Sequence, residues 1–296
     1  MSISPNWIAL DWGTTHLRGW AMSAGNTVLA EAHSDRGMGT LTPSEFPAAF
    51  AELTRDWTAA PAIACGMVGA RQGWIEAAYQ AVPCTPLPTS FTKAPTNAAS
   101  VHIIPGLSQS SPADVMRGEE TQIAGFLALN PGWDGVLCMP GTHTKWVQIS
   151  AGEVVSFQTC MTGDLFAAIS GHTVLKHSVV SDDWDDAAFA EALSDTLSRP
   201  EKLAARLFAL RAEGLLHGLG NATAKARLSG LLIGAELAAT KPYWLGQQIG
   251  IIGAGPVADA YVKALASQGA PATVADGPRV TLAGLTAAWT ILKGQL

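Results

Sequence analysis

The chain has 296 residues, enough for one large domain or two of ordinary size, and 48% of them are hydrophobic while only 14% are charged. This composition is typical of a compact globular protein and excludes an intrinsically disordered one. With 18 basic and 24 acidic residues, the formal net charge is -6. No overall positive field therefore favours nucleic acid or anionic lipid, so an anionic ligand would need a few local donors.

The sequence lacks the usual targeting and membrane patterns. Asp11 and Arg18 interrupt the apolar run that a signal peptide needs, and no stretch approaches the ~18 uninterrupted apolar residues of a membrane span. The cysteines show neither a C-x-x-C pair nor a histidine at metal-ligand spacing. We therefore expect a cytoplasmic protein in which the cysteines are small core side chains, namely Cys65, Cys84, Cys138 and Cys160.

Hydrophobic periodicity predicts an α/β protein with two similarly built halves. The first half is expected to contain strands over 7–11, 18–23 and 28–32, a helix over 43–58, strands over 62–65 and 101–104, and a helix over 117–129. The second half is expected to contain strands over 135–139, 145–149 and 154–158, helices over 164–175, 187–197, 200–213 and 222–239, then strand 248–252, helix 256–267, strand 272–275 and helix 280–293.

The first turn between strands in each half is rich in glycine and threonine. These turns contain DWGTT over 11–15 and PGTHT over 140–144. Glycine permits a tight turn, and successive N–H groups with threonine hydroxyls can cradle phosphate oxygens, although the same residues are common in plain turns. Their recurrence at one place in both halves favours a two-sided grip on a polyphosphate. The expected phosphate contacts are Gly13, Thr14, Thr15, Gly141, Thr142 and His143.

Six sequence blocks extend this pattern over essentially the whole chain. They are IALDWGTTHLRGW (8–20), CGMVGARQGW (65–74), VMRGEETQ (115–122), MPGTHTKWVQ (139–148), MTGDL (161–165) and LSGLLIGAEL (228–237). Together they resemble the 2-dehydro-3-deoxygalactonokinase family, within the superfamily of actin-like proteins, sugar kinases and hexokinases. The resemblance implies two actin-like (ribonuclease H-like) lobes with mixed sheets around a central nucleotide cleft.

The resemblance also implies two domains that carry different parts of the site. Residues 1–128 would form the N-terminal lobe, with the sugar-acid side and the first phosphate turn. Residues 129–296 would form the C-terminal lobe, with the second phosphate turn and the adenosine site. The implied ligands are ATP, Mg²⁺ and a small-molecule sugar acid, with neither nucleic acid nor membrane as a partner, and a homodimer is left open.

Asp11 is the expected metal-associated residue because it ends the first strand and opens the first phosphate turn. Mg²⁺ favours one or two carboxylates together with phosphate oxygens. The alternative role of Asp11 is to cap the turn. In the second turn, Met139 and Pro140 stand where an aspartate often precedes the glycines in the resembling superfamily, which leaves Asp11 as the principal carboxylate.

Phosphoryl transfer to an alcohol needs alignment, charge neutralisation and a base that accepts the hydroxyl proton. Gly118 and two acids open a predicted helix shortly before the second phosphate turn, similar to the place where sugar kinases of the superfamily carry their catalytic acid. By that position Glu119 is the expected base, with Glu120 and Asp164 as rivals. The alternative roles are favourable interactions with a helix dipole for the two glutamates and an N-cap for Asp164.

A 2-keto-3-deoxy sugar acid carries a carboxylate, which the planar fork of an arginine binds well. Arg18 follows the first phosphate turn and Arg117 precedes the candidate base, so these two are the expected substrate ligands. Either of them could instead pair with a local acid. Trp12 is expected to form a wall of the sugar site, and its alternative is an ordinary core position.

A Gly-rich turn at 253–255 lies between a predicted strand and a helix. With Asp276 at the end of the next strand, it fits the dinucleotide fingerprint, but too little chain follows for a complete dinucleotide-binding domain. In the resembling superfamily, a turn of this kind contacts adenosine, so Gly253 and Gly255 are expected there. On the preceding helix, Gly230, Gly234 and Glu236 either line the adenine side or permit tight helix packing.

The resemblance therefore implies ATP-dependent phosphorylation of 2-dehydro-3-deoxy-D-galactonate at its 6-hydroxyl, in galactonate and galactose catabolism. No G-x-x-x-x-G-K-[ST] motif is present, which disfavours a P-loop kinase. Two alternatives stay open. A phosphohydrolase of the same fold would use Glu119 or Glu120 to orient water, and an NAD-dependent oxidoreductase would use the Gly253 turn.

Overall fold

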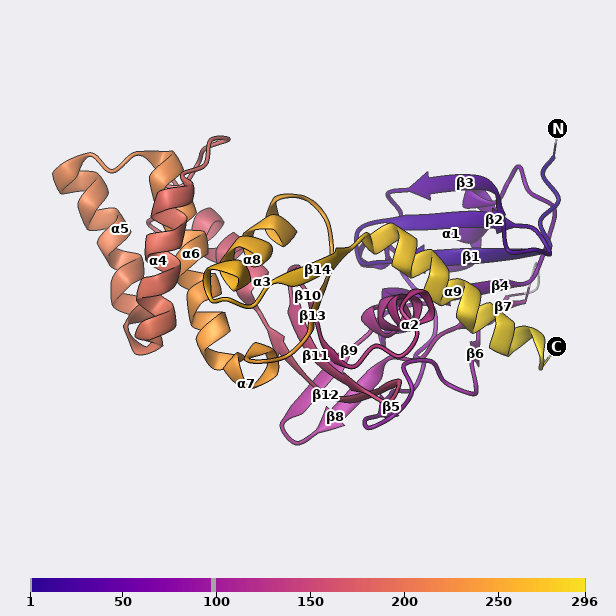
Figure 1. Cartoon of the computed structure of the whole chain (residues 1–296). Helices are drawn as coiled ribbons and strands as arrows, with labels where there is room; N and C mark the ends of the chain where they lie inside the picture. Colours follow the sequence, from indigo (N-terminus) through magenta and orange to yellow (C-terminus); the bar gives the residue numbers. More distant parts are fainter. Residues whose placement is uncertain (1, 97–99, 296) are drawn as a thin grey trace. The chain divides into compact units, whose positions relative to one another are not determined.

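The computed structural model describes residues 2–96 and 100–295, and its backbone is shown in Figure 1. Contacts between Cα atoms divide the chain into two compact units. Unit 1 comprises 1–134, 149–156 and 276–296, and unit 2 comprises 135–148 and 157–275. The expected division after residue 128 differs from these units, because the C-terminal helix and the segment 149–156 belong to unit 1.

Unit 1 contains a six-stranded mixed sheet with the order β3-β2-β1-β4-β7-β6 and a three-stranded sheet with the order β5-β8-β9. The six strands are β1 (Trp7–Trp12), β2 (Leu17–Met22), β3 (Val28–Ser34), β4 (Ala62–Cys65), β6 (Thr92–Lys93) and β7 (Val101–Ile103). The smaller sheet contains β5 (Gln80–Ala81), β8 (Leu107–Ser110) and β9 (Ala113–Met116). The α-helices are α1 (Phe46–Leu53), α2 (Glu119–Leu129) and α9 (Gly277–Lys293), and the 3-10 turns are Met38–Thr40 and Met67–Gly69.

The strand directions place the ends of two central strands side by side. β2 is antiparallel to both β1 and β3, whereas β4 runs parallel to β1 and β7 runs parallel to β4. The register of the parallel pair sets Asp11 opposite Cys65. The first phosphate turn and the turn after β4 therefore leave the sheet at the same edge.

Helix α9 packs on α2 at two glycine positions. A Cβ atom on Gly125 would lie 1.8 Å from the carbonyl oxygen of Val280, and one on Gly284 would lie 1.9 Å from the carbonyl oxygen of Thr121. The two helix backbones are therefore closer than any other residue would permit. This contact explains why the last helix belongs to unit 1.

Unit 2 is built on a five-stranded sheet with the order β12-β11-β10-β13-β14. The strands are β10 (Gly135–Met139), β11 (Thr144–Ser150), β12 (Glu153–Cys160), β13 (Ile249–Ile252) and β14 (Ala272–Ala275), and β10, β13 and β14 are parallel. The helices are α3 (Thr162–His172), α4 (Asp186–Ser198), α5 (Leu203–His217), α6 (Asn221–Ala239), α7 (Lys241–Trp244) and α8 (Gly255–Ser267), with a 3-10 turn at Pro200–Lys202.

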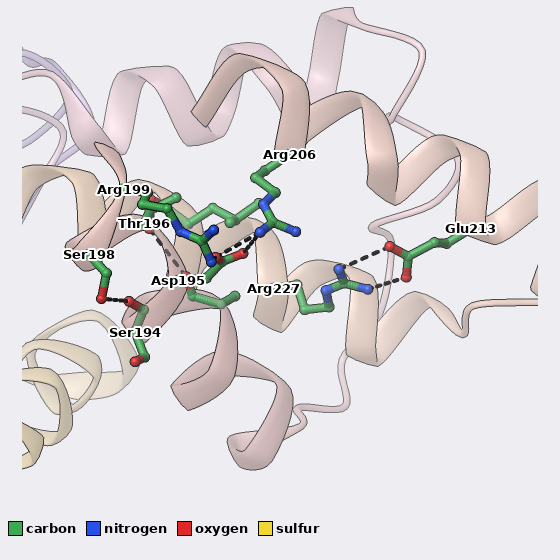
Figure 2. A network of polar contacts seen from close by, with 10 residues as sticks. Ser194, Asp195, Thr196, Ser198, Arg199, Arg206, Glu213 and Arg227 are labelled. Carbon is green, nitrogen blue, oxygen red and sulfur yellow. Dashed lines mark hydrogen bonds and ion pairs between the residues drawn. The ribbon is translucent and has the colours of Figure 1, made fainter. Parts of the chain in front are cut away.

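Helices α4, α5 and α6 are joined by ion pairs and close packing. Figure 2 shows Arg199 and Arg206 both reaching Asp195, while Arg227 of α6 pairs with Glu213 of α5. A Cβ on Gly230 would lie 2.4 Å from the carbonyl oxygen of Phe189, and one on Gly234 would lie 2.4 Å from that of Leu193. Of the two roles considered for these glycines, the structure supports tight packing of α6 on α4.

The expected elements agree with the structure in type and order, with local differences. Helix α1 is shorter than the predicted 43–58, and the β8–β9 hairpin was not predicted because its short strands are polar and partly exposed. Three of the expected core cysteines, Cys65, Cys84 and Cys138, are buried free thiols, whereas Cys160 is half-buried. Within the described residues, none of the helices combines the length and apolar character needed to traverse a bilayer.

Candidate functional site

The first phosphate turn lines a pocket of about 510 Å³ in unit 1. The N–H groups of residues 37–39 donate to the carbonyl oxygens of Thr15, Gly13 and Thr14 respectively, at 2.8–3.2 Å. These bonds fix the turn while leaving Thr14 and Thr15 exposed. The pocket is lined by the residues Asp11, Gly13, Thr14, Thr15, His16, Leu17, Arg18, His33, Ser34 and Asp35. Part of the expected phosphate site and one expected substrate arginine thus share this pocket.

Asp11 and Arg18 form an ion pair within this pocket. The Nη2 atom of Arg18 donates to Oδ2 of Asp11 at 2.6 Å, and the two side chains are 29% and 23% exposed. The thiol of Cys65 lies 3.8 Å from the other Asp11 oxygen. The sequence left open whether Arg18 would pair with a local acid, and the structure shows that it does.

Trp12 does not form a wall of this pocket. Its side chain is fully buried and its indole Nε1 donates to the carbonyl oxygen of Arg36 at 3.0 Å. The ring packs against Phe46 and Trp74, with ring centres 5.0 and 5.9 Å away. The expectation of a sugar contact is corrected because alternation along β1 directs Trp12 to the opposite face of the sheet from Asp11.

Two glycines let the start of α2 approach the end of β4. Gly66 and Gly118 have φ of 94° and 101°, and a Cβ on Gly118 would lie 3.3 Å from the Cα of Gly66. The half-buried Glu119 then turns back, and its Oε2 accepts the backbone N–H of Arg117 at 3.1 Å. The expected base thus lies on a constrained helix start with part of its side chain exposed.

Glu120, the rival acid beside it, is fully buried. Its Oε2 accepts the N–H of Gly118 at 2.5 Å, and its Oε1 accepts the hydroxyl of Thr121 at 3.0 Å. Burial, and next the charge of Glu119, raises the pKa of Glu120 to about 8. At neutral pH this carboxyl mostly retains its proton and has no exposed surface, so it is poorly suited to accept a proton from a substrate.

Arg117 is also buried, at 8% exposure. Its Nη2 donates to the carbonyl oxygen of Ala77 at 2.7 Å, and its guanidinium carbon lies 4.4 Å from the ring centre of Tyr79. Nε and Nη1 have no hydrogen-bond partner among the described residues. Because these atoms are covered by protein, Arg117 is less accessible to a sugar acid in this structure than Arg18.

In unit 2, the second phosphate turn packs against the first turn of α3. A Cβ on Gly163 would lie 2.3 Å from the carbonyl oxygen of Gly141, and the N–H of Asp164 donates to the carbonyl oxygen of Thr142 at 3.0 Å. The ring Nε2 of His143 lies 2.9 Å from Oδ2 of Asp164. The structure therefore brings together the phosphate turn and one of the three candidate acids, a pairing not predicted from the sequence.

The turn at 253–255 neighbours the second phosphate turn, because β13 and β10 are adjacent parallel strands. A Cβ on Gly253 would lie 3.9 Å from Cδ of Pro140, and Gly255 has a φ of 73° at the start of α8. Asp276, the acid of the dinucleotide interpretation, instead caps α9 by accepting the N–H of Arg279 at 2.9 Å. Gly253, one of the two glycines expected at adenosine, thus lies beside the start of the second phosphate turn.

A family model described as 2-keto-3-deoxy-galactonokinase matches residues 11–288. The chain belongs to the 2-keto-3-deoxy-galactonokinase family. It is 39% identical, over 97% of its length and 98% of the relative, to a Rhizobium meliloti protein named as a candidate 2-dehydro-3-deoxygalactonokinase. It is 35% identical, over 96% and 97% of the two chains, to the 2-dehydro-3-deoxygalactonokinase of Escherichia coli.

Solved structures support the fold of this family member. A Sinorhizobium meliloti protein described as a candidate 2-dehydro-3-deoxygalactonokinase gives a TM-score of 0.90 at 38% identity, with 97% and 99% of the two chains covered. The activator of the 2-hydroxyisocaproyl-CoA dehydratase from Clostridium difficile, solved with bound ADPNP, gives 0.50 at 14% identity and covers 97% and 95%. The expected α/β fold with mixed sheets, of the actin-like type, is confirmed.

The structure of this kinase-family chain also contains a buried polar cluster that the sequence did not predict. Glu236, considered for the adenine side, is 5% exposed and contacts Trp146, Thr162 and Tyr261. Lys145 is likewise buried, and its Nζ donates to the carbonyl oxygen of His143 at 3.2 Å. Because successive side chains along β11 face opposite sides of the sheet, Thr144 and Trp146 lie on the other face from Lys145. This alternation does not predict which distant residues those side chains contact.

Proposed function

We propose that the protein is a 2-dehydro-3-deoxygalactonokinase, which transfers the γ-phosphoryl group of ATP to the 6-hydroxyl of 2-dehydro-3-deoxy-D-galactonate. The observation that carries this proposal is the pocket of unit 1, where the first phosphate turn, a carboxylate and an arginine line one space. That combination suits a phosphate donor and an anionic acceptor. The Escherichia coli relative of that name, 35% identical over nearly the full length, supports the substrate.

Each unit carries a turn with proposed nucleotide contacts. In unit 1 the exposed hydroxyls of Thr14 and Thr15, with the N–H groups of their turn, would bind phosphate oxygens. In unit 2 the turn at 140–144 would bind phosphate through Gly141, Thr142 and His143. The neighbouring Gly253 and Gly255 would permit the close approach of adenosine.

Asp11 is the proposed ligand for Mg²⁺. In the part of the chain that the structure describes, no three His, Cys, Asp or Glu side chains group to hold a metal. Mg²⁺ bound through one carboxylate usually completes its coordination with substrate phosphates and water. The partly exposed Asp11 carboxylate in the phosphate pocket fits such a site. When bound, the ion would neutralise phosphate charge.

Glu119 is the proposed base. It would accept the proton of the 6-hydroxyl while the hydroxyl oxygen bonds to the γ-phosphorus and the bond to ADP breaks. Its partial exposure and its position at the start of α2 support this role. Glu120 is buried and mostly protonated at neutral pH, and Asp164 is hydrogen-bonded to His143.

Arg18 is the proposed ligand for the carboxylate of the sugar acid. It is 29% exposed and lines the pocket, and one of its nitrogens contacts Asp11. A guanidinium has five N–H donors, so this contact leaves others for a second carboxylate. Arg117 would contribute indirectly, by holding the backbone of Ala77 close to the turn at 66–69.

A coupled assay of ADP formation tests this function. The purified protein would be given ATP and Mg²⁺ with 2-keto-3-deoxy aldonates of both configurations at C4, and with galactose as a neutral control. We expect turnover with the galactonate-derived acid, none with galactose, and a 6-phosphate product by ³¹P NMR. ATP consumption that needs no sugar acid would favour a phosphohydrolase, and inactivity on every acid would refute the assignment.

A further inference from the structure

Three separate segments of unit 2 carry either residues proposed to hold the nucleotide or Asp164, which contacts one of them. The turn at 140–144 joins β10 to β11, α3 begins at Thr162 two residues before Asp164, and α8 begins at Gly255. The turn at 140–144 contacts the start of α3 through the bond from the Asp164 N–H to the carbonyl oxygen of Thr142, and it lies beside Gly253. A deeper connection is needed to keep their mutual placement, because phosphate ligands must be held within about 0.5 Å of their working geometry.

A single carboxylate on α6 connects all three. The Oε1 atom of Glu236 accepts the indole N–H of Trp146 on β11 at 2.7 Å. Its Oε2 atom accepts two hydroxyls, that of Tyr261 on α8 at 2.7 Å and that of Thr162 at the start of α3. The oxygen of Tyr261 lies 3.0 Å from the hydroxyl of Thr144. Because the Tyr261 proton points to Glu236, Thr144 must donate in this last bond.

The network is almost completely shielded from water. Glu236 is 5% exposed, and Trp146, Tyr261 and Thr144 are each 1% exposed or less, while Thr162 at the edge of the network is half-buried. All three groups that donate to the carboxylate are neutral, so hydrogen bonds rather than an ion pair compensate its burial. Loss of one donor would leave part of a buried acceptor unsatisfied, which costs free energy. The arrangement in which all three donors reach the carboxylate is therefore favoured over others.

Each arm of the network ends beside a proposed nucleotide contact. Thr144 directly follows His143, Thr162 lies two residues before Asp164, which contacts His143, and the helix of Tyr261 follows the Gly253 turn. We propose that Glu236 is a positioning residue, which holds the second phosphate turn, the start of α3 and the adenosine turn in the arrangement that binds ATP. This inference rests on the proposed kinase function.

Direct binding of a non-hydrolysable ATP analogue, measured by calorimetry, tests this role. Thr162→Val and Tyr261→Phe remove single hydroxyls, and Glu236→Gln replaces the acceptor of two hydroxyls by an N–H₂ donor. We expect the Kd for the analogue to rise about tenfold in each variant, while the KM for the sugar acid stays within about twofold of wild type.

Thr196→Val is the matched control. Its hydroxyl is as buried as that of Tyr261 and donates to the carbonyl oxygen of Leu231 at 2.7 Å, joining α4 to α6 away from the three segments. This variant should lose stability in urea without a change in the Kd. If Thr162→Val and Tyr261→Phe lower the urea midpoint like the control and bind the analogue as wild type does, the network is only structural and the inference is wrong.

The same measurement separates this inference from the proposed function. A wild-type protein that fails to bind the analogue would refute both. A wild-type protein that binds it, with variants that bind equally well, would refute the positioning role of Glu236 alone. A rise of the same size in the KM for the sugar acid would indicate general loosening of the protein, which also contradicts the inference.

Discussion

Asp11 and Arg18 are direct cross-strand partners on β1 and β2, and their side chains form an ion pair of 2.6 Å. Both remain partly exposed in the pocket of unit 1. Antiparallel pairing holds the two side chains on one face of the sheet. The proposed metal carboxylate and the proposed ligand for the sugar acid are therefore positioned by the same two strands.

Replacing Arg18 should impair the use of the sugar acid more than the binding of ATP. Arg18→Gln removes the charge that the proposal assigns to the substrate carboxylate, and a hydrogen bond to a charged group is worth about 1.5–3 kcal/mol. We expect kcat/KM for the sugar acid to fall roughly 10- to 100-fold, with the KM for ATP within about threefold of wild type. Steady-state kinetics with each substrate varied in turn measures this.

Arg36→Gln provides the comparison, because Arg36 is an arginine of unit 1 that pairs at the surface with Glu52. It should leave both KM values unchanged, since exposed ion pairs contribute little. An unchanged KM for the sugar acid in Arg18→Gln would remove Arg18 from the substrate site and direct attention to Arg117.

Substituting each of the three candidate acids should change the kinetic constants in a different way. Glu119→Gln is expected to abolish turnover while leaving ATP affinity nearly intact, because the amide cannot accept the hydroxyl proton. Asp164→Asn should mainly raise the KM for ATP, since Asp164 orients His143 in the second phosphate turn. Glu120→Gln should retain most activity, because the wild-type carboxyl is already mostly protonated at neutral pH. Near-normal turnover in Glu119→Gln would transfer the role of base to one of the other two acids.

Local patterns in the sequence were sufficient to predict the elements that frame the site. Alternation and turn residues placed β1, β2 and β10, and the glycine and threonine turns followed from them. The same local signals left the direction of individual side chains undecided. Trp12 and Asp11 are neighbours, yet one is in the core and the other lines the pocket, because successive strand residues face opposite sides.

Features that depend on long-range contacts were not predictable. The pairing of His143 with Asp164 and the contacts of Glu236 join segments 21 to 90 residues apart. The placement of α9 in unit 1 depends on Gly125 and Gly284. The sequence around each glycine does not indicate which helix packs against it. Local propensity carries no information about such partners.

Two glycine substitutions should have opposite effects on the free energy of unfolding, because only one of the two, Gly125, lies in the contact between α2 and α9. In Gly125→Ala the new Cβ would clash with the carbonyl oxygen of Val280, so we expect a loss of about 1–3 kcal/mol or more in the free energy of unfolding. Gly214 on α5 has open space around its Cα, and Gly214→Ala should stabilise by up to about 1 kcal/mol. Urea unfolding of both variants tests this. A neutral or stabilising Gly125→Ala would contradict the close helix contact.

The raised pKa of Glu120 predicts a stability that falls with pH. Below a pH of about 4.5 the folded and unfolded states both hold this proton, and above about 8 both have released it. Between these values the folded state binds the proton more tightly, so rising pH favours unfolding. The slope from this one group approaches about 1 kcal/mol per pH unit.

Glu120→Gln removes this titration. The free energy of unfolding of wild type minus that of Glu120→Gln, from urea curves at pH 5.5, 7 and 8.5, should therefore decrease steadily as pH rises. Glu52→Gln, which changes an exposed carboxylate of the same unit, should give a difference from wild type that varies little with pH. Because burial is the main cause of the raised pKa, a difference for Glu120→Gln that is constant from pH 5.5 to 8.5 would show that this carboxyl is ionised in the folded protein, and Glu120 would again compete with Glu119 as the base.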